Sequence, residues 1–337
     1  MQVPWRPGLC KDSFQSRVRW RALLLLGIAA ALLSSCAWLK QDPSLGVPGV
    51  HGGVVSVSEP NAARVGAEVL RQGGNAIDAA AAVQFALNVV EPESSGIGGG
   101  GFMLIYLAKE QRVLAVDSRE KAPAAASPDM FVPFLAHGSS VFSLASTSGL
   151  AVGVPGTLLG VATALDNWGS ISLSSALAPA IELAEKGFRI GPSLAENSNS
   201  SRLQNEPGNP AYDEARKVFF PHDSPLVEGE ILVQNDLAKT FKLIARHGPA
   251  VFYQENGEIA KAIVSTQLAT RSDPLSGDEL AAGAGRMTTR DLANYDVVIR
   301  DPVEGDYRGL TSKTMGPPSS GALTVIQILK LIERVPI

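Results

Sequence analysis

Apolar residues follow regular spacings along this chain, and each spacing predicts one kind of secondary structure. A helical spacing runs through residues 61–72 and ends at Gly73-Gly74. A second, almost wholly apolar segment at residues 77–90 predicts a helix that is buried on most sides, with Asn75 or Asp78 as its N-terminal cap. The positions that share the apolar face of the first helix are Ala62, Val65, Gly66, Val69 and Leu70.

Later segments continue this mixture of helical and extended patterns. Residues 194–223 are polar and are expected to be exposed, and residues 271–285 are expected to form a flexible connection. A short helix at residues 291–295 is expected to be capped by Thr288 or Thr289. Further helices are predicted at residues 158–168, 174–187, 236–248, 258–267 and 323–332, and strands at residues 297–299 and 303–308.

Residues 98–101 are four consecutive glycines between the buried helix and the apolar run at residues 102–107. Four glycines lose much backbone entropy on folding, so they indicate either a positive φ or the close approach of another group. A second apolar run at residues 113–116 follows a turn-like segment, and the two runs predict a β-hairpin. This hairpin carries the charged residues 117–121 at its far end.

Arg119 lies within that charged segment, Asp117-Ser118-Arg119-Glu120-Lys121. A guanidinium at the end of a hairpin, beside a glycine-rich turn, is suited to bidentate capture of a ligand carboxylate. The alternative is an ion pair with Asp117 or Glu120 at the rim of a site, and composition alone favours that alternative. Arg119 is therefore the first candidate binding residue, with both interpretations open.

The bulk composition narrows the classes of function. With 337 residues and 45% hydrophobic content, the chain can bury a large core. The formal net charge is −4, and no block of Lys and Arg with interleaved aromatic residues occurs beyond the extreme N-terminus, so nucleic acid is not an expected partner. His51, His137, His222 and His247 are isolated in the sequence, so no metal site is expected.

The N-terminus has the features of a targeting segment. Closely spaced arginines precede an apolar run at residues 22–33, which is too short to span a bilayer. The Leu-Ser-Ser-Cys sequence ending at Cys36 matches a bacterial lipobox, so residues 1–35, including Cys10, are predicted to be a lipoprotein signal peptide and Cys36 to carry lipid. Residues 36–52 would then be a lipidated tether on the periplasmic side of a bacterial membrane. An uncleaved signal anchor is the alternative.

The sequence gives no support for a dinucleotide-binding motif or for the nucleophile motif of α/β hydrolases. Residues 96–101 satisfy the G-x-G-x-x-G pattern of dinucleotide sites, in which a strand enters the glycines and a helix leaves them. Here a helix enters and a strand leaves, so a dinucleotide cofactor is not expected. No G-x-S-x-G segment is present, which removes support for a serine hydrolase of the α/β type.

A series of segments from about residue 53 to residue 332 resembles the γ-glutamyltranspeptidase (glutathione hydrolase) family, in the order that the family shows. The segments are residues 65–74 with Asn75-Ala76-Ile77-Asp78-Ala79-Ala80, Gln84-Phe85-Ala86-Leu87, residues 98–101 with Phe102-Met103, Ser118-Arg119-Glu120 with Ala122-Pro123, Val154-Pro155-Gly156, Asp291-Leu292-Ala293 with Tyr295, Tyr307-Arg308-Gly309, and Pro317-Pro318-Ser319-Ser320-Gly321.

The resemblance implies a layered α/β fold, the αββα sandwich of the N-terminal-nucleophile hydrolases, of which residues 53–337 would supply the large-subunit part. In that family a precursor cuts itself, and the new N-terminal threonine of the small subunit attacks the γ-glutamyl amide with its own amine as base. The implied substrates are glutathione and other γ-glutamyl compounds, with water, amino acids or dipeptides as acceptors and no cofactor. Arg119 would bind the α-carboxylate of the γ-glutamyl group.

The sequence departs from the family at the nucleophile. The family's threonine begins a T-T-H-[FY]-S-like segment downstream of Pro-Pro-Ser-Ser-Gly, and no such segment follows Gly321 here. Thr288-Thr289 is followed by Arg290-Asp291 and matches the helix-capping segment instead. We therefore expect no catalytic residue in this chain, a small subunit from the same precursor as its partner, and no activity of the chain alone. The alternatives are an inactive fragment and a lipid-anchored γ-glutamyl-binding protein.

Overall fold

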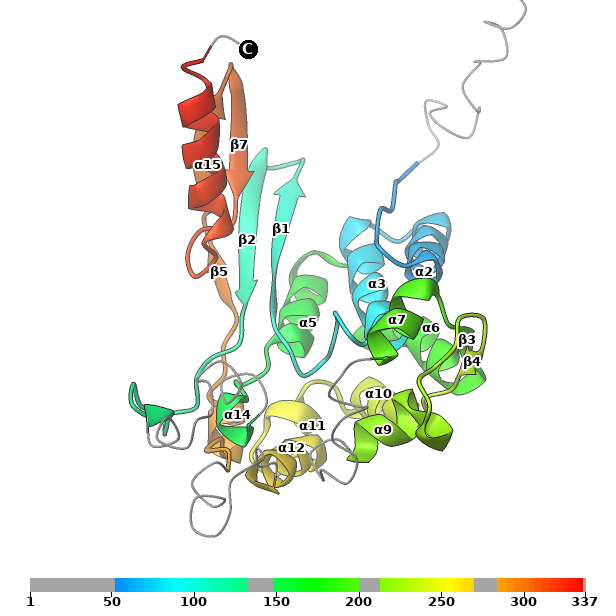
Figure 1. Ribbon diagram of the computed structural model, residues 1–337. Coiled ribbons are helices and arrows are strands. Elements are labelled where there is room, and N and C mark those ends of the chain that lie inside the picture. Colours follow the sequence, from blue (N-terminus) through cyan, green and yellow to red (C-terminus); the bar gives the residue numbers. More distant parts are fainter. Residues whose placement is uncertain (1–51, 133–147, 200–212, 270–283, 336–337) are drawn as a thin grey trace, which may run out of the picture. The chain divides into compact units, whose positions relative to one another are not determined.

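A β-hairpin follows the glycine run and leads directly to Arg119. In the computed structural model, β1 (Gly101–Leu107) and β2 (Arg112–Ser118) pair antiparallel, with Gly101 opposite Ser118. β5 (Val298–Arg300) lies antiparallel along the other edge of β2 and completes a three-stranded sheet in the order β1-β2-β5 (Figure 1). The structure confirms the β-hairpin predicted from the runs at residues 102–107 and 113–116, and the strand predicted at residues 297–299.

The structure describes residues 52–132, 148–199, 213–269 and 284–335. The described residues from Gly53 onward belong to one compact unit. Cys10, Cys36, the predicted signal peptide and most of the predicted connection at residues 271–285 lie outside the described residues. Within the described ranges, no helix combines the length and the apolar character needed to cross a membrane.

The first two helices form as the periodicity predicts. α2 (Pro60–Arg71) and α3 (Ala76–Val90) pack against each other. The Asn75 side chain accepts hydrogen bonds from the N–H groups at the start of α3, while the Asp78 carboxylate accepts one from the Asn75 N–H. Both predicted caps are therefore used together, as a capping box.

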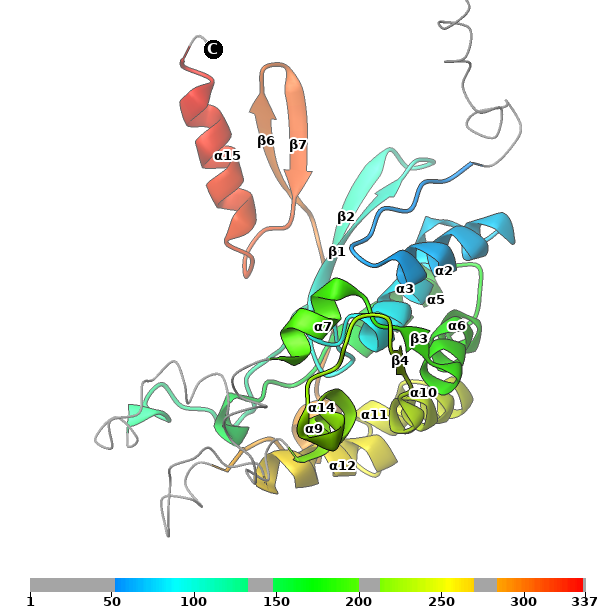
Figure 2. The same cartoon turned by 45° about the vertical axis from the view of Figure 1, so that its right-hand side comes forward.

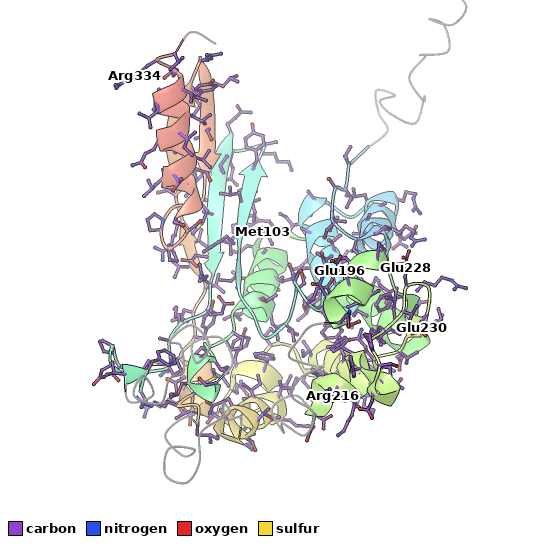
Figure 3. The ribbon with its side chains drawn as sticks, viewed as in Figure 1. Met103, Glu196, Arg216, Glu228, Glu230 and Arg334 are labelled. Carbon is purple, nitrogen blue, oxygen red and sulfur yellow. The ribbon has the colours of Figure 1, made fainter. Side chains whose placement is uncertain are left out.

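α5 (Thr157–Trp168) joins the sheet to the helices, because it packs against both β2 and α3. Met103 on β1 packs against an apolar cluster formed by Ile105, Val116 and Ala164 between the hairpin and α5 (Figure 3). This cluster fixes the hairpin against the helical part of the molecule.

The main core lies among helices. α6 (Leu173–Lys186) packs against α3 and against α10 (Asn235–His247), as Figure 2 shows for α6 and α10. Phe85 of α3 meets Phe241 of α10 edge-on, with ring centroids 6.0 Å apart. α11 (Ala250–Tyr253), α12 (Glu258–Ala269) and α14 (Thr289–Ala293) extend this arrangement, and Thr288 caps α14 as predicted.

Residues 194–223, expected to be exposed, are partly buried where the structure describes them. Leu194 and Ser198 are buried in α7 (Pro192–Ser198), because Leu194 joins the main core and the Ser198 hydroxyl accepts a hydrogen bond from the Leu226 N–H. The other elements nearby are η2 (Gly149–Ala151), β3 (Phe188–Arg189), α9 (Asp213–Phe219), η3 (Pro221–Asp223) and β4 (Ile231–Leu232), with β3 and β4 paired antiparallel.

The C-terminal elements form a second hairpin and a helix. β6 (Val303–Tyr307) pairs antiparallel with β7 (Leu310–Thr314), and α15 (Gly321–Ile332) packs on β6. β7 was not predicted, because its sequence is mostly polar. The turn between the strands has positive φ at both central residues, 48° at Arg308 and 80° at Gly309, as type I′ hairpins require.

The described residues form a mixed α/β fold with one sheet of three strands and two sheets of two strands. The four-layer αββα sandwich is a finer arrangement than these sheets reveal, and it stays a prediction.

Candidate functional site

Arg119 follows the last residue of β2, at the point where strand pairing stops. Its N–H donates to Asp117 Oδ1 (3.1 Å), and its carbonyl accepts from the Tyr295 hydroxyl (2.9 Å). Lys121 and Val154 then form an isolated antiparallel bridge. Side chains, rather than neighbouring strands, hold the backbone of Arg119.

The Arg119 side chain is 53% exposed and lines a hollow of about 620 Å³. Its Nε lies 3.3 Å from Glu120 Oε2, and its guanidinium carbon lies 5.9 Å from the centre of the Phe102 ring. Of the two ion pairs considered from the sequence, the one with Glu120 forms, whereas Asp117 pairs with Arg300 at 2.9 Å. Among the described residues no group accepts a hydrogen bond from Nη1 or Nη2 of Arg119, so these donors are available to a ligand.

Positive side chains outnumber carboxylates around the hollow. Arg119, Lys121 and Arg300 line it together with Asp117 and Glu120. Lys121 Nζ donates to the Asp296 carbonyl (3.0 Å) and lies 5.0 Å from the centre of the Tyr295 ring, so within the described ranges no carboxylate neutralises it. The excess positive charge favours an anionic ligand. The remaining walls are Val298, Pro317 and Pro318.

The glycine run is required by close packing at one position. A Cβ on Gly100 would lie 2.6 Å from the Ser118 carbonyl oxygen and 2.7 Å from the Glu120 nitrogen, whereas Gly98 and Gly101 have open space. None of the four glycines has a positive φ. The close-approach explanation is therefore confirmed at Gly100, and the positive-φ explanation is wrong.

Gly156 has a structural role that sequence reasoning did not identify. A Cβ at this position would collide with the Tyr295 hydroxyl and with the Ser118 carbonyl oxygen. The Gly156 N–H also donates to the Gly99 carbonyl (2.8 Å), which joins the start of α5 to the glycine run. A Pro-Gly dipeptide before a helical pattern is typical of a turn, but the distant partners of Gly156 leave no local signal in the sequence.

Tyr295 is the second group that the sequence did not place at the site. Its side chain is buried, with only 4% of the residue exposed. Burial, with a smaller contribution from the charges of Asp117 and Glu120, raises the pKa of Tyr295 to about 12. The phenol carries its proton at neutral pH, as an unperturbed tyrosine also does, and donates it to the Arg119 carbonyl.

A larger groove, of about 830 Å³, lies between α2 and α6 and shares no residue with the hollow at Arg119. Two of its cations are neutralised within their own helices, because Arg71 pairs with Glu68 and Lys186 pairs with Glu182. Arg64 is the third cation of the groove, so the groove and the hollow each have three cations and two carboxylates, and formal charge does not distinguish them.

Neither of the two histidines that the structure describes lines the hollow or the groove. His51 and His137 lie outside the described residues, His222 falls in η3, and His247 is exposed in the last turn of α10. In the part of the chain that the structure describes, no three His, Cys, Asp or Glu side chains lie close enough together to hold a metal ion.

Comparisons with known proteins agree with one another. A family model described as Gamma-glutamyltranspeptidase matches residues 62–337. The chain is 47% identical over 283 residues to the glutathione hydrolase proenzyme of Bacillus subtilis (strain 168), covering 84% of this chain and 44% of that protein. It is 39% identical over 331 residues to the glutathione hydrolase proenzyme of Escherichia coli (strain K12), covering 97% and 53%. The chain thus spans about half the length of these curated relatives.

Solved structures give the same picture of the fold. The crystal structure of Helicobacter pylori gamma-glutamyltranspeptidase matches with a TM-score of 0.75 and 39% identity, covering 86% of this chain and 77% of that one. A cephalosporin acylase from Bacillus halodurans matches with a TM-score of 0.70 and 27% identity, covering 89% and 53%.

Proposed function

Because the chain belongs to the γ-glutamyltranspeptidase family, we propose that it supplies the large-subunit part of an enzyme that cleaves the γ-glutamyl amide of glutathione and related compounds. Its fold is the mixed α/β fold of the N-terminal-nucleophile hydrolases. The γ-glutamyl group would pass to water, to an amino acid or to a dipeptide. The observation that carries this proposal is the half-exposed Arg119 guanidinium, which lines a hollow with an excess of positive side chains.

Arg119 would bind the α-carboxylate of the γ-glutamyl group. A guanidinium has several N–H donors in one plane, so Nη1 and Nη2 can meet both oxygens of a carboxylate while Nε keeps its contact with Glu120. The neighbouring Lys121 and Arg300 add a positive potential that attracts the same group.

The attacking group would come from the rest of the precursor, as the N-terminal threonine of a small subunit. Support for such a partner lies on α15, where apolar side chains remain exposed although the helix packs on β6. Exposed apolar surface of this kind is typical of an interface. Strands of the partner would complete the αββα sandwich. The exposed side chains on α15 are Leu323, Val325, Ile328 and Leu331.

For the location of the protein, we propose a lipid anchor at Cys36 that holds the enzyme on the periplasmic side of a bacterial membrane. The support is the sequence alone, namely the apolar run at residues 22–33 followed by Leu-Ser-Ser-Cys. Removal of residues 1–35 would leave the tether at residues 36–52 between the lipid and the folded unit.

The test of the activity begins with the genomic DNA beyond codon 337. We expect an in-frame T-T-H-like segment, and we expect the complete precursor to cleave itself and then to release glutamate from glutathione. A precursor in which the first threonine of that segment is replaced by alanine should do neither. A stop codon in place of that segment, together with binding of glutathione by the chain, would favour the non-catalytic binding protein instead.

A further inference from the structure

The Asp291–Tyr295 segment matched the family in sequence, but the proposed reaction gives it no role. In the structure it touches the segment that carries Arg119 at two points. The Tyr295 hydroxyl donates to the Arg119 carbonyl (2.9 Å), and Asp291 Oδ1 accepts from the Ala124 N–H (2.8 Å). The next residue adds a third contact, because its carbonyl accepts from Lys121 Nζ. These contacts connect positions far apart in the chain, 176 residues in the case of Tyr295 and Arg119.

The Tyr295 hydroxyl is held in a fixed place. Its ring stacks on the Tyr253 ring, with centroids 5.9 Å apart and an angle of 23° between the planes. Gly156 lies directly beside the hydroxyl, and any side chain there would occupy the same space. The helix that precedes Tyr295 is itself fixed at its start by the capping box of Thr288 and Asp291.

The Arg119 carbonyl depends on this hydroxyl because Arg119 lies beyond the last strand pair of β2. The structure gives no other partner for that carbonyl among the described residues, and the Arg119 N–H is held by Asp117 alone. Loss of the hydroxyl would leave the backbone of Arg119 fixed on one side only. The direction of its guanidinium would then be less well defined.

We propose that Tyr295 is a positioning residue for Arg119, which holds the arginine backbone so that the guanidinium meets the substrate carboxylate in one orientation. The inference rests on the proposed function, since it assumes that Arg119 binds the γ-glutamyl group. It goes further by assigning a role to the Asp291–Tyr295 segment, which lies outside the sheet and stabilises the backbone that carries Arg119.

The test compares Tyr295→Phe with Tyr253→Phe in the complete precursor. Both changes remove one buried hydroxyl and keep the ring, but the Tyr253 hydroxyl contacts the Pro155 carbonyl and the Leu159 N–H instead of Arg119. Loss of one hydrogen bond that positions a binding group should raise KM for glutathione about 3- to 10-fold in Tyr295→Phe, with kcat little changed. Tyr253→Phe should keep the wild-type KM, although both variants lose some thermal stability.

A second measurement separates this inference from the proposed activity. Amide hydrogen exchange of the chain itself should become faster at residues 119–121 in Tyr295→Phe, and not in Tyr253→Phe. Unchanged exchange there, or an equal rise of KM in both variants, would overturn the positioning role. If the wild-type precursor does not act on γ-glutamyl compounds, the proposed function fails, and the exchange result alone decides whether Tyr295 holds Arg119.

Discussion

Asp78 offers a quantitative test of how α3 is held to the segment between α5 and α6. Its carboxylate is fully buried, and no cation lies beside it among the described residues. It accepts hydrogen bonds from the N–H groups of Asn75 (2.8 Å), Ser170 (2.7 Å) and Ile171 (3.1 Å) and from the Ser170 hydroxyl (2.5 Å). These bonds tie the start of α3 to the connection between α5 and α6.

Asp78→Asn keeps the shape of the side chain but replaces one acceptor oxygen by a donor. Oδ1 can still accept from the N–H groups of Ser170 and Ile171, and the Ser170 hydroxyl can rotate to accept from the new amide. The new amide nitrogen, however, lies opposite the Asn75 N–H, and two donors cannot form a hydrogen bond with each other. One buried donor is left without an acceptor, which should lower the free energy of unfolding by about 1–3 kcal/mol. Asp78→Ala would leave three N–H groups unpaired, for a loss of about 3–6 kcal/mol, comparable with the whole stability of many domains.

The same carboxylate predicts a pH dependence with a definite sign. Burial alone would raise the pKa of Asp78, but the hydrogen bonds from Ser170, Asn75 and Ile171 outweigh it and lower the pKa below 3.8. A carboxyl with a lowered folded pKa stabilises the protein above its unfolded pKa, and this contribution is lost as the pH falls through the folded value. The stability difference between wild type and Asp78→Asn should therefore be constant near neutral pH and should shrink below about pH 4.

The assay is urea unfolding at several pH values, with Asp166→Asn as the control. Asp166 lies exposed on α5, so its change should stay within about 0.5 kcal/mol of wild type. Equal stability of Asp78→Asn and wild type at pH 7, or a difference that grows in acid, would refute the reasoning.

The remaining predictions concern packing, the proposed lipid anchor and the activity of the isolated chain. Gly156→Ala should lower the free energy of unfolding by about 1–3 kcal/mol through overpacking, while Gly98→Ala, which meets open space, should stay near wild type in the same urea assay. Expressed in a Gram-negative host, the protein should incorporate labelled palmitate, and label that persists in Cys36→Ser would disprove the lipid anchor. Purified residues 36–337 alone should release no nitroaniline from a γ-glutamyl anilide, because these residues contain no T-T-H-like segment.

The local parts of the fold were predictable because local chemistry decides them. The start of α3 follows from Asn75 and Asp78, because the Asn75 side chain accepts from the first N–H groups of the helix and the Asp78 carboxylate accepts from the Asn75 N–H. The hairpin follows from two apolar runs separated by a short turn, and Thr288 caps α14 by the same rule as Asn75. Each of these features depends on residues within a few positions of one another.

The features that were missed depend on distant residues or on weak patterns. α7 is short and polar, and only its contact with the main core explains why Leu194 is buried. β7 has too few apolar residues to show a period, although the Arg308-Gly309 turn was a usable signal for a hairpin. Arg119 could be predicted as a candidate binding residue from its position after the hairpin. Its hydrogen bond with Tyr295 could not be predicted, because it depends on tertiary packing between residues far apart in the sequence.

The central claim is that Arg119 binds the α-carboxylate of a γ-glutamyl substrate. The most direct measurement compares two substrates in the complete precursor, γ-glutamyl p-nitroanilide and 4-aminobutyryl p-nitroanilide, which is the same molecule without the α-carboxylate. Arg119→Lys keeps the positive charge but loses the planar pair of donors. Each charge-assisted hydrogen bond contributes about 1.5–3 kcal/mol, so kcat/KM for the γ-glutamyl substrate should fall roughly tenfold to a hundredfold in this variant.

The second substrate provides the internal control, because it has no carboxylate for Arg119 to bind. Its kcat/KM should differ little between wild type and Arg119→Lys, so the preference of wild type for the γ-glutamyl substrate should largely disappear. Self-cleavage of the precursor should continue in the variant, since no free substrate carboxylate takes part in it. An Arg119→Lys enzyme that processes normally and keeps the wild-type preference between the two anilides would show that Arg119 forms only an ion pair with Glu120 at the rim of the hollow.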